Sequence, residues 1–181
     1  MSDIQTHNFV TSIYYKDLNL SQELIDHCLK KELDNVEENR TSFFRPTDET
    51  LRKLTLDAVF GFFTEVGKNL GFEGLRLDNT WVQKYNIAEQ HRVHVHGLTV
   101  NEYSFVCYID CTENSGSTVF YNVGYPYVDT GYHKIKPKVG RCVLFPGSVP
   151  HEAQANKDEK RIIVSGNITF LGKDQFEAQD K

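Results

Sequence analysis

Apolar residues recur with helical spacing in two segments of the first seventy residues. Ser21 can cap a short helix, and a longer helix is predicted over residues 47–70, where apolar side chains recur every three or four positions. Gly71 follows this segment and is typical of a helix end. Aromatic and β-branched residues at 9–15 predict a strand before both helices. The chain is therefore expected to begin with a strand and two helices.

From residue 75 onward the pattern changes to short β-rich runs separated by turns. The predicted strands are residues 80–85, 92–98, 103–110, 117–123, 140–145 and 161–170. Residues 114–116 predict a hairpin turn, and residues 124–131, rich in Tyr, Pro and Gly, predict a loop. Residues 171–181 fit a frayed tail or a short helix. Helices followed by such an array predict an α+β chain with an all-β sandwich or barrel as its core.

Composition and charge narrow the classes of function. A length of 181 residues predicts a single domain. With 25 acidic and 20 basic side chains and no basic cluster, the chain is not expected to bind duplex nucleic acid directly. No apolar run has the length of a membrane span and no leader pattern is present, so a cytoplasmic location is expected. The cysteines lack C-x-x-C spacing and are expected to be reduced; they are Cys28, Cys107, Cys111 and Cys142.

Two histidines on one strand face are candidates for metal ligands. Side chains alternate along a strand, so His94 and His96 point to the same side and His91 is out of phase with them. Two imidazoles about 6–7 Å apart on one face can reach a single metal ion. The spacing alone fits equally well a pair of hydrogen-bonded histidines in a polar interior.

A third histidine and an inward arginine are predicted further along the chain. A Pro/Gly turn after one strand delivers His151. The strand that Arg161 opens places Ile163, Ser165 and Asn167 on the same face as the arginine. An inward guanidinium requires a buried anion, and a carboxylate matches its forked donors. Arg161 alone would also fit an exposed edge strand, but its position after His151 favours the inward arrangement.

Some weaker candidates remain. Gln83 and Tyr85 share a strand face with Trp81 and can line a substrate pocket, although such a row is more often core. Residues 125–127, Tyr-Pro-Tyr, are a candidate substrate lid because of their composition and their place between two strands.

The order of these motifs resembles that of the 2-oxoglutarate/Fe(II) oxygenase superfamily. The shared pattern is His-x-His, a Pro-terminated strand leading to His, and Arg about ten residues later. Within the superfamily the chain looks most like a branch of prolyl-hydroxylase-like oxygenases common in phage and marine bacteria. The likeness covers most of the chain; the similar stretches are residues 9–14, 79–81, 94–96, 104–108, 114–116, 144–151 and 161–167.

This resemblance implies a fold, a cofactor and a reaction. The fold would be a double-stranded β-helix (jelly roll, cupin-like) over residues 75–170, with a supporting strand and helices over 1–74 and a tail over 171–181. His94 and His151 would bind Fe(II), while Arg161 would bind the distal carboxylate of the cosubstrate 2-oxoglutarate. Tyr108 would be a second donor to that carboxylate, and Ser165 and Asn167 are further candidates for cosubstrate contacts. With O2, such proteins hydroxylate a C–H bond of a peptide, often prolyl, or of a small molecule.

Two positions depart from the superfamily pattern. His96 stands where Asp or Glu is usual, and a neutral imidazole weakens Fe(II) binding relative to a carboxylate. The third ligand is His96, Glu102, Asp110 or water; His96 is favoured because it shares a strand face with His94. Ile163 replaces the usual serine two residues after the arginine, which removes one hydrogen bond to the cosubstrate.

Two other functions fit the same residues. One is a cupin-type metalloprotein that does not use 2-oxoglutarate, with Glu102 as a fourth ligand and Arg161 without a cosubstrate to hold. The other is a β-helix that serves as a binding module and is not an enzyme. All three share a fold, so the fold cannot decide among them.

Overall fold

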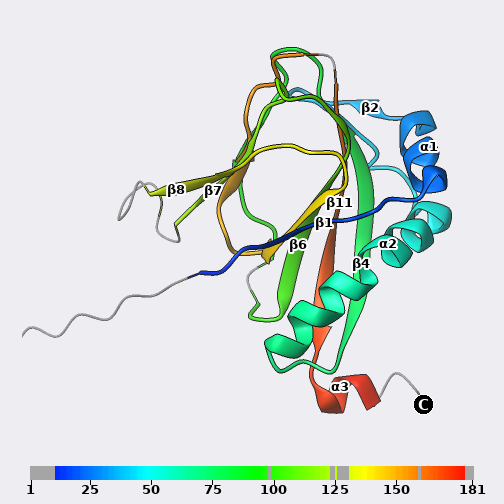
Figure 1. The fold of residues 1–181 in the computed structure, drawn as a ribbon, viewed down its shortest axis with the longest axis vertical. Helices are drawn as coiled ribbons and strands as arrows, with labels where there is room; N and C mark the ends of the chain where they lie inside the picture. The colour runs from blue at the N-terminus through cyan, green and yellow to red at the C-terminus, as the bar shows by residue number, and fades with distance from the viewer. Residues whose placement is uncertain (1–10, 98, 123–124, 126–130, 159, 178–181) are drawn as a thin grey trace, which may run out of the picture.

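The protein is described by a computed structural model over residues 11–97, 99–122, 125, 131–158 and 160–177. These residues form two β-sheets with helices against one of them (Figure 1). The large sheet has the strand order β1 (Tyr14–Asp17), β9 (Arg141–Pro146), β6 (Glu102–Cys111), β11 (Arg161–Leu171), β4 (Gly74–Lys84), β3 (Arg40–Thr41) and β2 (Asp34–Asn35). The small sheet has the order β5 (His91–His94), β10 (His151–Ala153), β7 (Thr118–Tyr121) and β8 (Tyr132–Ile135).

The path of the chain between the sheets gives the fold class. Strands β4, β6, β9 and β11 lie side by side in the large sheet, and β5, β7, β8 and β10 make up the small one. All the strand pairs are antiparallel. This arrangement of four strands facing four is a double-stranded β-helix, which confirms the predicted fold class. The predicted hairpin at residues 114–116 is wrong, because this turn joins β6 to β7, which belong to different sheets.

Both predicted helices are present, and the second spans almost the predicted range. Helix α1 (Gln22–Lys30) is capped by Ser21, and α2 (Glu49–Asn69) is capped by Asp48 and followed by Gly71 at φ +85°. Both lie on the side of the large sheet that faces away from β7 and β8 (Figure 1). A short helix, α3 (Lys173–Glu177), occupies part of the predicted tail. No helix in the described part of the chain has the length and apolarity to cross a membrane.

Two apolar clusters hold the layers together. Alternate residues of β11 separate them: Ile162 and Val164 pack under the helices, whereas Ile163 points between the sheets. The cluster under the helices includes Leu24, Phe63, Val82 and Phe105, and the cluster between the sheets includes Tyr85, Tyr108, Phe120 and Phe145. The four cysteines form no disulfide, as expected.

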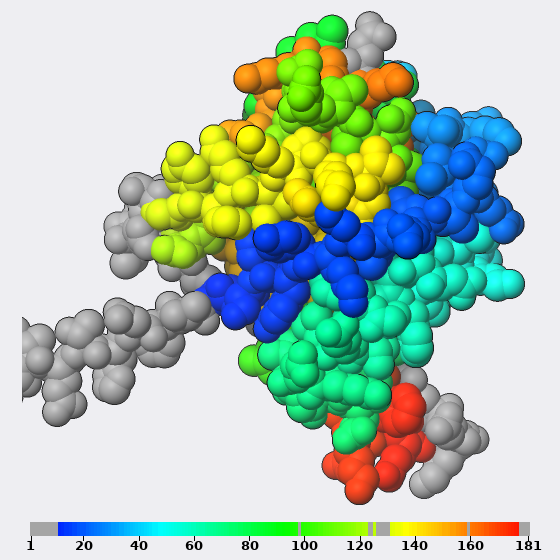
Figure 2. All heavy atoms as spheres, viewed as in Figure 1, coloured from blue at the N-terminus to red at the C-terminus, as the bar shows by residue number. Residues whose placement is uncertain are grey.

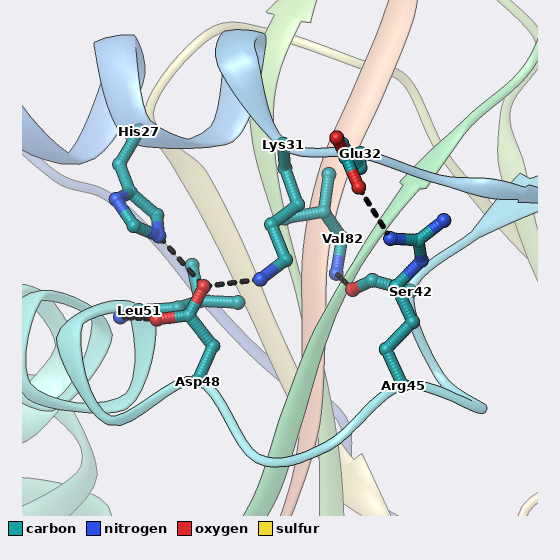
Figure 3. Close-up of polar contacts among 8 residues, drawn as sticks. All are labelled: His27, Lys31, Glu32, Ser42, Arg45, Asp48, Leu51 and Val82. Carbon is teal, nitrogen blue, oxygen red and sulfur yellow. Dashed lines mark hydrogen bonds and ion pairs between the residues drawn. The ribbon is translucent and has the colours of Figure 1, made fainter.

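Polar contacts fix the N-terminal elements on this core. Asp48 caps α2 through the Leu51 N–H and also binds His27 and Lys31 at the end of α1 (Figure 3). The segment that contains β1 runs across the molecule between the β8–β9 region and α2, as the blue atoms of Figure 2 show. Lys16 on β1 forms an ion pair with Glu65 on α2 at 3.0 Å.

The structure differs from prediction mainly in short strands. β2, β3, β8 and β10 have between two and four residues each, too few to show an alternating pattern. β5 ends at His94, earlier than the predicted 98. Residues 9–10 of the predicted first strand, and residues 126–127 of the suggested lid, lie outside the described residues.

Candidate metal and cosubstrate site

Three histidines converge at one edge of the small sheet. His94 ends β5, His96 follows two residues later, and His151 opens β10 directly opposite His94. Their ligand atoms all lie within 4.8 Å of one another. The Nε2 atoms of His96 and His151 are 3.3 Å apart, and two nitrogens bound to one metal ion at about 2.1 Å each would be about 3.0–3.4 Å apart. His96 and His151 thus have the spacing of two ligands of one metal ion, and His94 completes a group that could hold it.

Backbone carbonyls orient two of these rings. The Nδ1 of His94 lies 2.7 Å from the Arg92 carbonyl oxygen, and the Nδ1 of His151 lies 2.9 Å from that of Val149. A carbonyl only accepts, so each Nδ1 carries the proton and donates it. The Nε2 atoms are left with free lone pairs, which is the tautomer that a metal ligand needs.

A turn at Gly147 binds the backbone of His96, the third histidine. The His96 N–H donates to the Gly147 carbonyl at 2.8 Å, and the Gly147 N–H donates to the Glu102 carbonyl at 2.9 Å. A Cβ at Gly147 would approach the Gly97 nitrogen to 2.8 Å, closer than real Cβ atoms come. The turn after β9 therefore needs glycine in order to pack against the segment that carries His96.

His91 joins the group through an irregularity that sequence alternation does not reveal. His151 and Ala153 on β10 pair with His94 and His91, so two steps on one strand match three on the other. This bulge in β5 turns His91 to the face of His94. The two rings stack with centroids 4.0 Å apart.

Burial keeps the imidazoles neutral. Desolvation, with the neighbouring histidines adding to it, lowers the pKa of His91 and of His96 to about 4. Burial also lowers the pKa of His94, and it lowers the pKa of His151 well below its ordinary value. Neutral imidazoles are the form that binds metal, so no proton has to leave at neutral pH.

No carboxylate completes the group. Among the residues that the structure describes, the group of side chains whose ligand atoms converge includes neither Glu102 nor Asp110. The Glu102 carboxylate accepts a long hydrogen bond from the Thr99 N–H instead, at 3.4 Å. Of the four options left open by the sequence for the third ligand, the geometry therefore matches His96.

Arg161 is buried beside the histidines without an acidic partner. Its exposure is 0%, and its guanidinium lies 4.7 Å from the centre of the Tyr85 ring and 5.8 Å from that of Tyr108. It donates to the Thr118 hydroxyl at 3.1 Å and to the Gln154 carbonyl at 3.3 Å, while its Nε has no acceptor. No described carboxylate forms an ion pair with it. A buried cation is thus left with unused donors.

Thr118 and Tyr108 extend this cationic end. The Tyr108 and Thr118 hydroxyls are 2.6 Å apart, and Thr118 in turn accepts from Arg161. Sequence analysis named Tyr108 but missed Thr118. The signal was weak, because one hydroxyl in a β-branched strand looks like an ordinary strand residue.

One cavity between the sheets is shared by most of the candidates. The three histidines and Arg161 line it together with three other sequence candidates, Gln83, Tyr85 and Ser165, and with Ile163. Glu152 also lines it, and its carboxylate accepts from the Tyr121 hydroxyl at 2.9 Å. Asn167 does not line it: this side chain accepts from the Ser104 hydroxyl at 2.8 Å, further along β11.

Comparison with known proteins places the fold. No family model and no curated protein matches the chain. The viral collagen prolyl hydroxylase of Paramecium bursaria Chlorella virus-1 has a similar structure, with a TM-score of 0.63 and 16% identity over 88% of this chain and 96% of that one. A prolyl-4-hydroxylase of Pseudomonas putida is similar with a TM-score of 0.57 and 18% identity over 90% of this chain and 94% of that one. The non-haem α-ketoglutarate-dependent epimerase SnoN is similar with a TM-score of 0.67 and 13% identity over 88% of this chain and 79% of that one.

The chain has the fold of the 2-oxoglutarate/Fe(II) oxygenases. The resemblance inferred from motifs is therefore confirmed at the level of the fold. Function on such a fold is decided by the site, so it must be argued from the residues in the cavity.

Proposed function

We propose that the chain is a non-haem Fe(II), 2-oxoglutarate-dependent oxygenase that hydroxylates a C–H bond of a peptide or a small molecule. The observation that carries this proposal is the buried Arg161, with unused donors, in the same cavity as three convergent histidines. The Chlorella virus enzyme was solved in complex with 2-oxoglutarate, which supports the same cosubstrate here. A single oxygenase domain and a cytoplasmic location, both expected from the sequence, belong to this proposal.

The donor set fits 2-oxoglutarate at both ends. A carboxylate offers two acceptors to the fork of a guanidinium, and it would satisfy the Arg161 donors that have no protein partner. Tyr108 and Thr118 add hydroxyls at the same end. The opposite end of the molecule, a 2-oxo acid, offers two oxygens to a metal held by the histidines.

The donor set also fits Fe(II), with one consequence. Imidazole is a suitable ligand for iron, but three neutral rings leave both positive charges of the ion uncompensated. The 2-oxo acid end of the cosubstrate would supply one of the missing negative charges, while its other carboxylate would compensate Arg161. Metal and cosubstrate should therefore bind more tightly together than either binds alone.

The protein's part in the reaction is to hold the metal, to orient the cosubstrate and to exclude water. Fe(II) with 2-oxoglutarate supplies the oxidising power for C–H hydroxylation by O2, and the overall change converts 2-oxoglutarate to succinate and carbon dioxide. His94, His96 and His151 would hold the metal. Arg161 fixes the far carboxylate, and Ile163, buried between the sheets, helps to keep water away.

An anaerobic titration with Fe(II) and 2-oxoglutarate tests the proposal. We expect the visible charge-transfer band of a chelated 2-oxo acid, together with quenching of the single tryptophan, Trp81, whose ring centre is 6.1 Å from that of His96. His151→Ala should abolish both signals. Arg161→Lys keeps the charge but loses the fork, and we expect it to weaken 2-oxoglutarate binding about tenfold or more. Arg76→Ala, an exposed arginine, is the matched control.

Each outcome of this titration points to one function. A band lost in His151→Ala and weakened in Arg161→Lys, with circular dichroism unchanged, supports the oxygenase. Metal binding without a band in the wild-type protein would favour a metalloprotein of the cupin type. A failure to bind metal at all would contradict the enzyme and leave a binding module.

A further inference from the structure

A second cleft adjoins the histidine group and opens toward solvent. It has a volume of about 440 Å³, within the range of about 300–1,000 Å³ that is usual for ligand sites. Five residues line both this cleft and the cavity between the sheets: Trp81, Gln83, His91, His94 and His96. The remaining wall comes from the segment around β2 and β3, residues 36–44. A molecule in the cleft would therefore end at the histidines.

Aromatic rings form one wall of the cleft. Phe44 is 72% exposed and meets Phe43 edge to face at 5.2 Å, and Phe43 meets Trp81 at 5.0 Å. The Trp81 ring in turn lies 6.1 Å from that of His96. These rings, which we call the aromatic row, lead from solvent to the candidate metal position. Ring faces bind apolar groups and attract cations.

The charged groups of the cleft are acidic. Its described lining contains Glu37 and Glu38 but neither lysine nor arginine. Arg92 binds Glu38 at 2.7 Å, whereas Glu37 is 85% exposed and lies 3.8 Å from Arg92. These three groups, Glu37, Glu38 and Arg92, sum to one negative charge. The rim therefore favours a cationic ligand and repels an anionic one.

The amide of Gln83 lies at the junction of the cleft with the cavity. Gln83 is only 6% exposed, and its amide donates a single long hydrogen bond of 3.5 Å to Asn39. Its carbonyl oxygen accepts no hydrogen bond from the described residues. Because Gln83 lines the cleft, a ligand that brings an N–H or O–H can donate to this oxygen.

We propose that the cleft selects substrates with an alkylammonium or guanidinium group on an apolar stem. The cation would lie against Glu37 and the aromatic row, and the stem would lead toward the histidines. Such a group can come from a free amine or from a lysine or arginine side chain of a peptide. This inference rests on the proposed function for the chemistry at the inner end, but selection for cations is a property of the cleft itself.

Trp81 fluorescence provides the binding assay, because it is the single tryptophan of the chain and lies in the cleft wall. The matched probes are n-pentylammonium, 1-pentanol and pentanoate. Acetylated tripeptide amides with central lysine or glutamate form the second arm. We expect the cationic probes to bind roughly tenfold more tightly than the anionic ones, and added salt to reduce the difference. The stronger of the two cationic probes identifies the source of the group.

Two exposed positions allow variants that leave the fold intact. Glu37→Gln and Phe44→Ala should each weaken n-pentylammonium binding about two- to fivefold. Glu37→Gln should leave 1-pentanol binding unchanged. The matched controls are Glu73→Gln and Phe60→Ala, which make the same changes at exposed positions outside the cleft.

The titrations are run on the protein alone and on the protein loaded with Ni(II) and 2-oxoglutarate. Equal affinity for the three pentyl probes, or a preference for pentanoate, would overturn the inference. Selective cation binding by a protein that fails to bind metal would support the inference about the cleft and contradict the proposed oxygenase function. Binding of metal and 2-oxoglutarate without cation selectivity would support the proposed oxygenase function and contradict the inference about the cleft.

Discussion

At the scale of single residues, Thr118 links the parts of the candidate cosubstrate site. It accepts a hydrogen bond from Arg161 at 3.1 Å and pairs with the Tyr108 hydroxyl at 2.6 Å. Both partners are fully buried, so neither can turn to water if Thr118 is lost. Its hydroxyl therefore positions the guanidinium and satisfies the phenol at the same time.

Replacing Thr118 by valine removes the hydroxyl and keeps the shape of the side chain. Because two buried polar groups, the Arg161 guanidinium and the Tyr108 hydroxyl, lose a hydrogen-bond partner, we expect a loss of about 1–3 kcal/mol in the free energy of unfolding. We also expect weaker 2-oxoglutarate binding with little change in metal affinity. Urea denaturation and the anaerobic titration measure the two effects. Thr47→Val, at an exposed position, is the control, and equal 2-oxoglutarate affinity in both variants would assign Thr118 a purely structural role.

Sequence alone indicated most of the residues that the cavity brings together. Alternation along a strand sufficed for Arg161, because the extra residues at the register shifts of β11 lie on its partner strands. The two-residue spacing sufficed for His94 and His96, although His96 lies beyond the end of β5. It did not suffice for His91, because a bulge turns this ring to the other face. Asn167 shares a face with Arg161 in the sequence but lies too far along β11 to reach the cavity.

At the scale of elements, Asp48 joins the two N-terminal helices. Its carboxylate accepts from the Leu51 N–H at 2.9 Å, which caps α2, and it binds His27 and Lys31 of α1 (Figure 3). Burial raises the pKa of this carboxyl, but the hydrogen bonds from Leu51, Lys31 and His27 outweigh it and hold the pKa well below its usual range. The folded protein thus favours the ionised form.

Asp48→Asn keeps a capping side chain and removes the charge. We expect the variant to lose about 1 kcal/mol in the free energy of unfolding at pH 7. Because the folded pKa lies below the unfolded one, the wild-type advantage is complete well above pH 4 and disappears as the pH falls through the folded pKa. Urea unfolding between pH 7 and pH 3 follows this. Asp57→Asn on the exposed face of α2 is the control, and a pH-independent difference would contradict the ion pairs.

The elements that could be predicted are those long enough to show a period. Helix α2 and the strands β6 and β11 were found because each repeats its pattern over ten residues or more. The strands β2 and β3 have two residues each, and they form through pairing, β3 with β4 and β2 with β3, rather than through any preference of their own. Strand β10 was anticipated only as the turn that delivers His151.

At the scale of the whole molecule, the candidate site draws on both sheets. The histidines belong to the small sheet or to the segment that follows β5, whereas Arg161 belongs to the large sheet. A cosubstrate that reaches from the metal to Arg161 would therefore connect the two layers. Ligand binding should then stabilise the entire fold, and not only the pocket.

A thermal melt with Ni(II) and 2-oxoglutarate tests this connection. With Ni(II) bound, 2-oxoglutarate at a hundredfold above its dissociation constant should add about 2.7 kcal/mol of stability, or a further rise in Tm of roughly 5–10 °C for a chain of this size. 2-Oxoglutarate without metal should raise the Tm little, because the histidines offer it no charge. His151→Ala should remove the shift. A shift of the same size in that variant would place the metal elsewhere.

The small sheet is the weaker of the two layers, since β5 and β10 have four and three residues. If the proposed function is right, the ligands that bridge the sheets also restrain the backbone that opens most readily to hydrogen exchange and to proteases. A cell short of iron or of 2-oxoglutarate would then hold more of this protein in its cleavable form. Its abundance, and not only its turnover, would follow the supply of both.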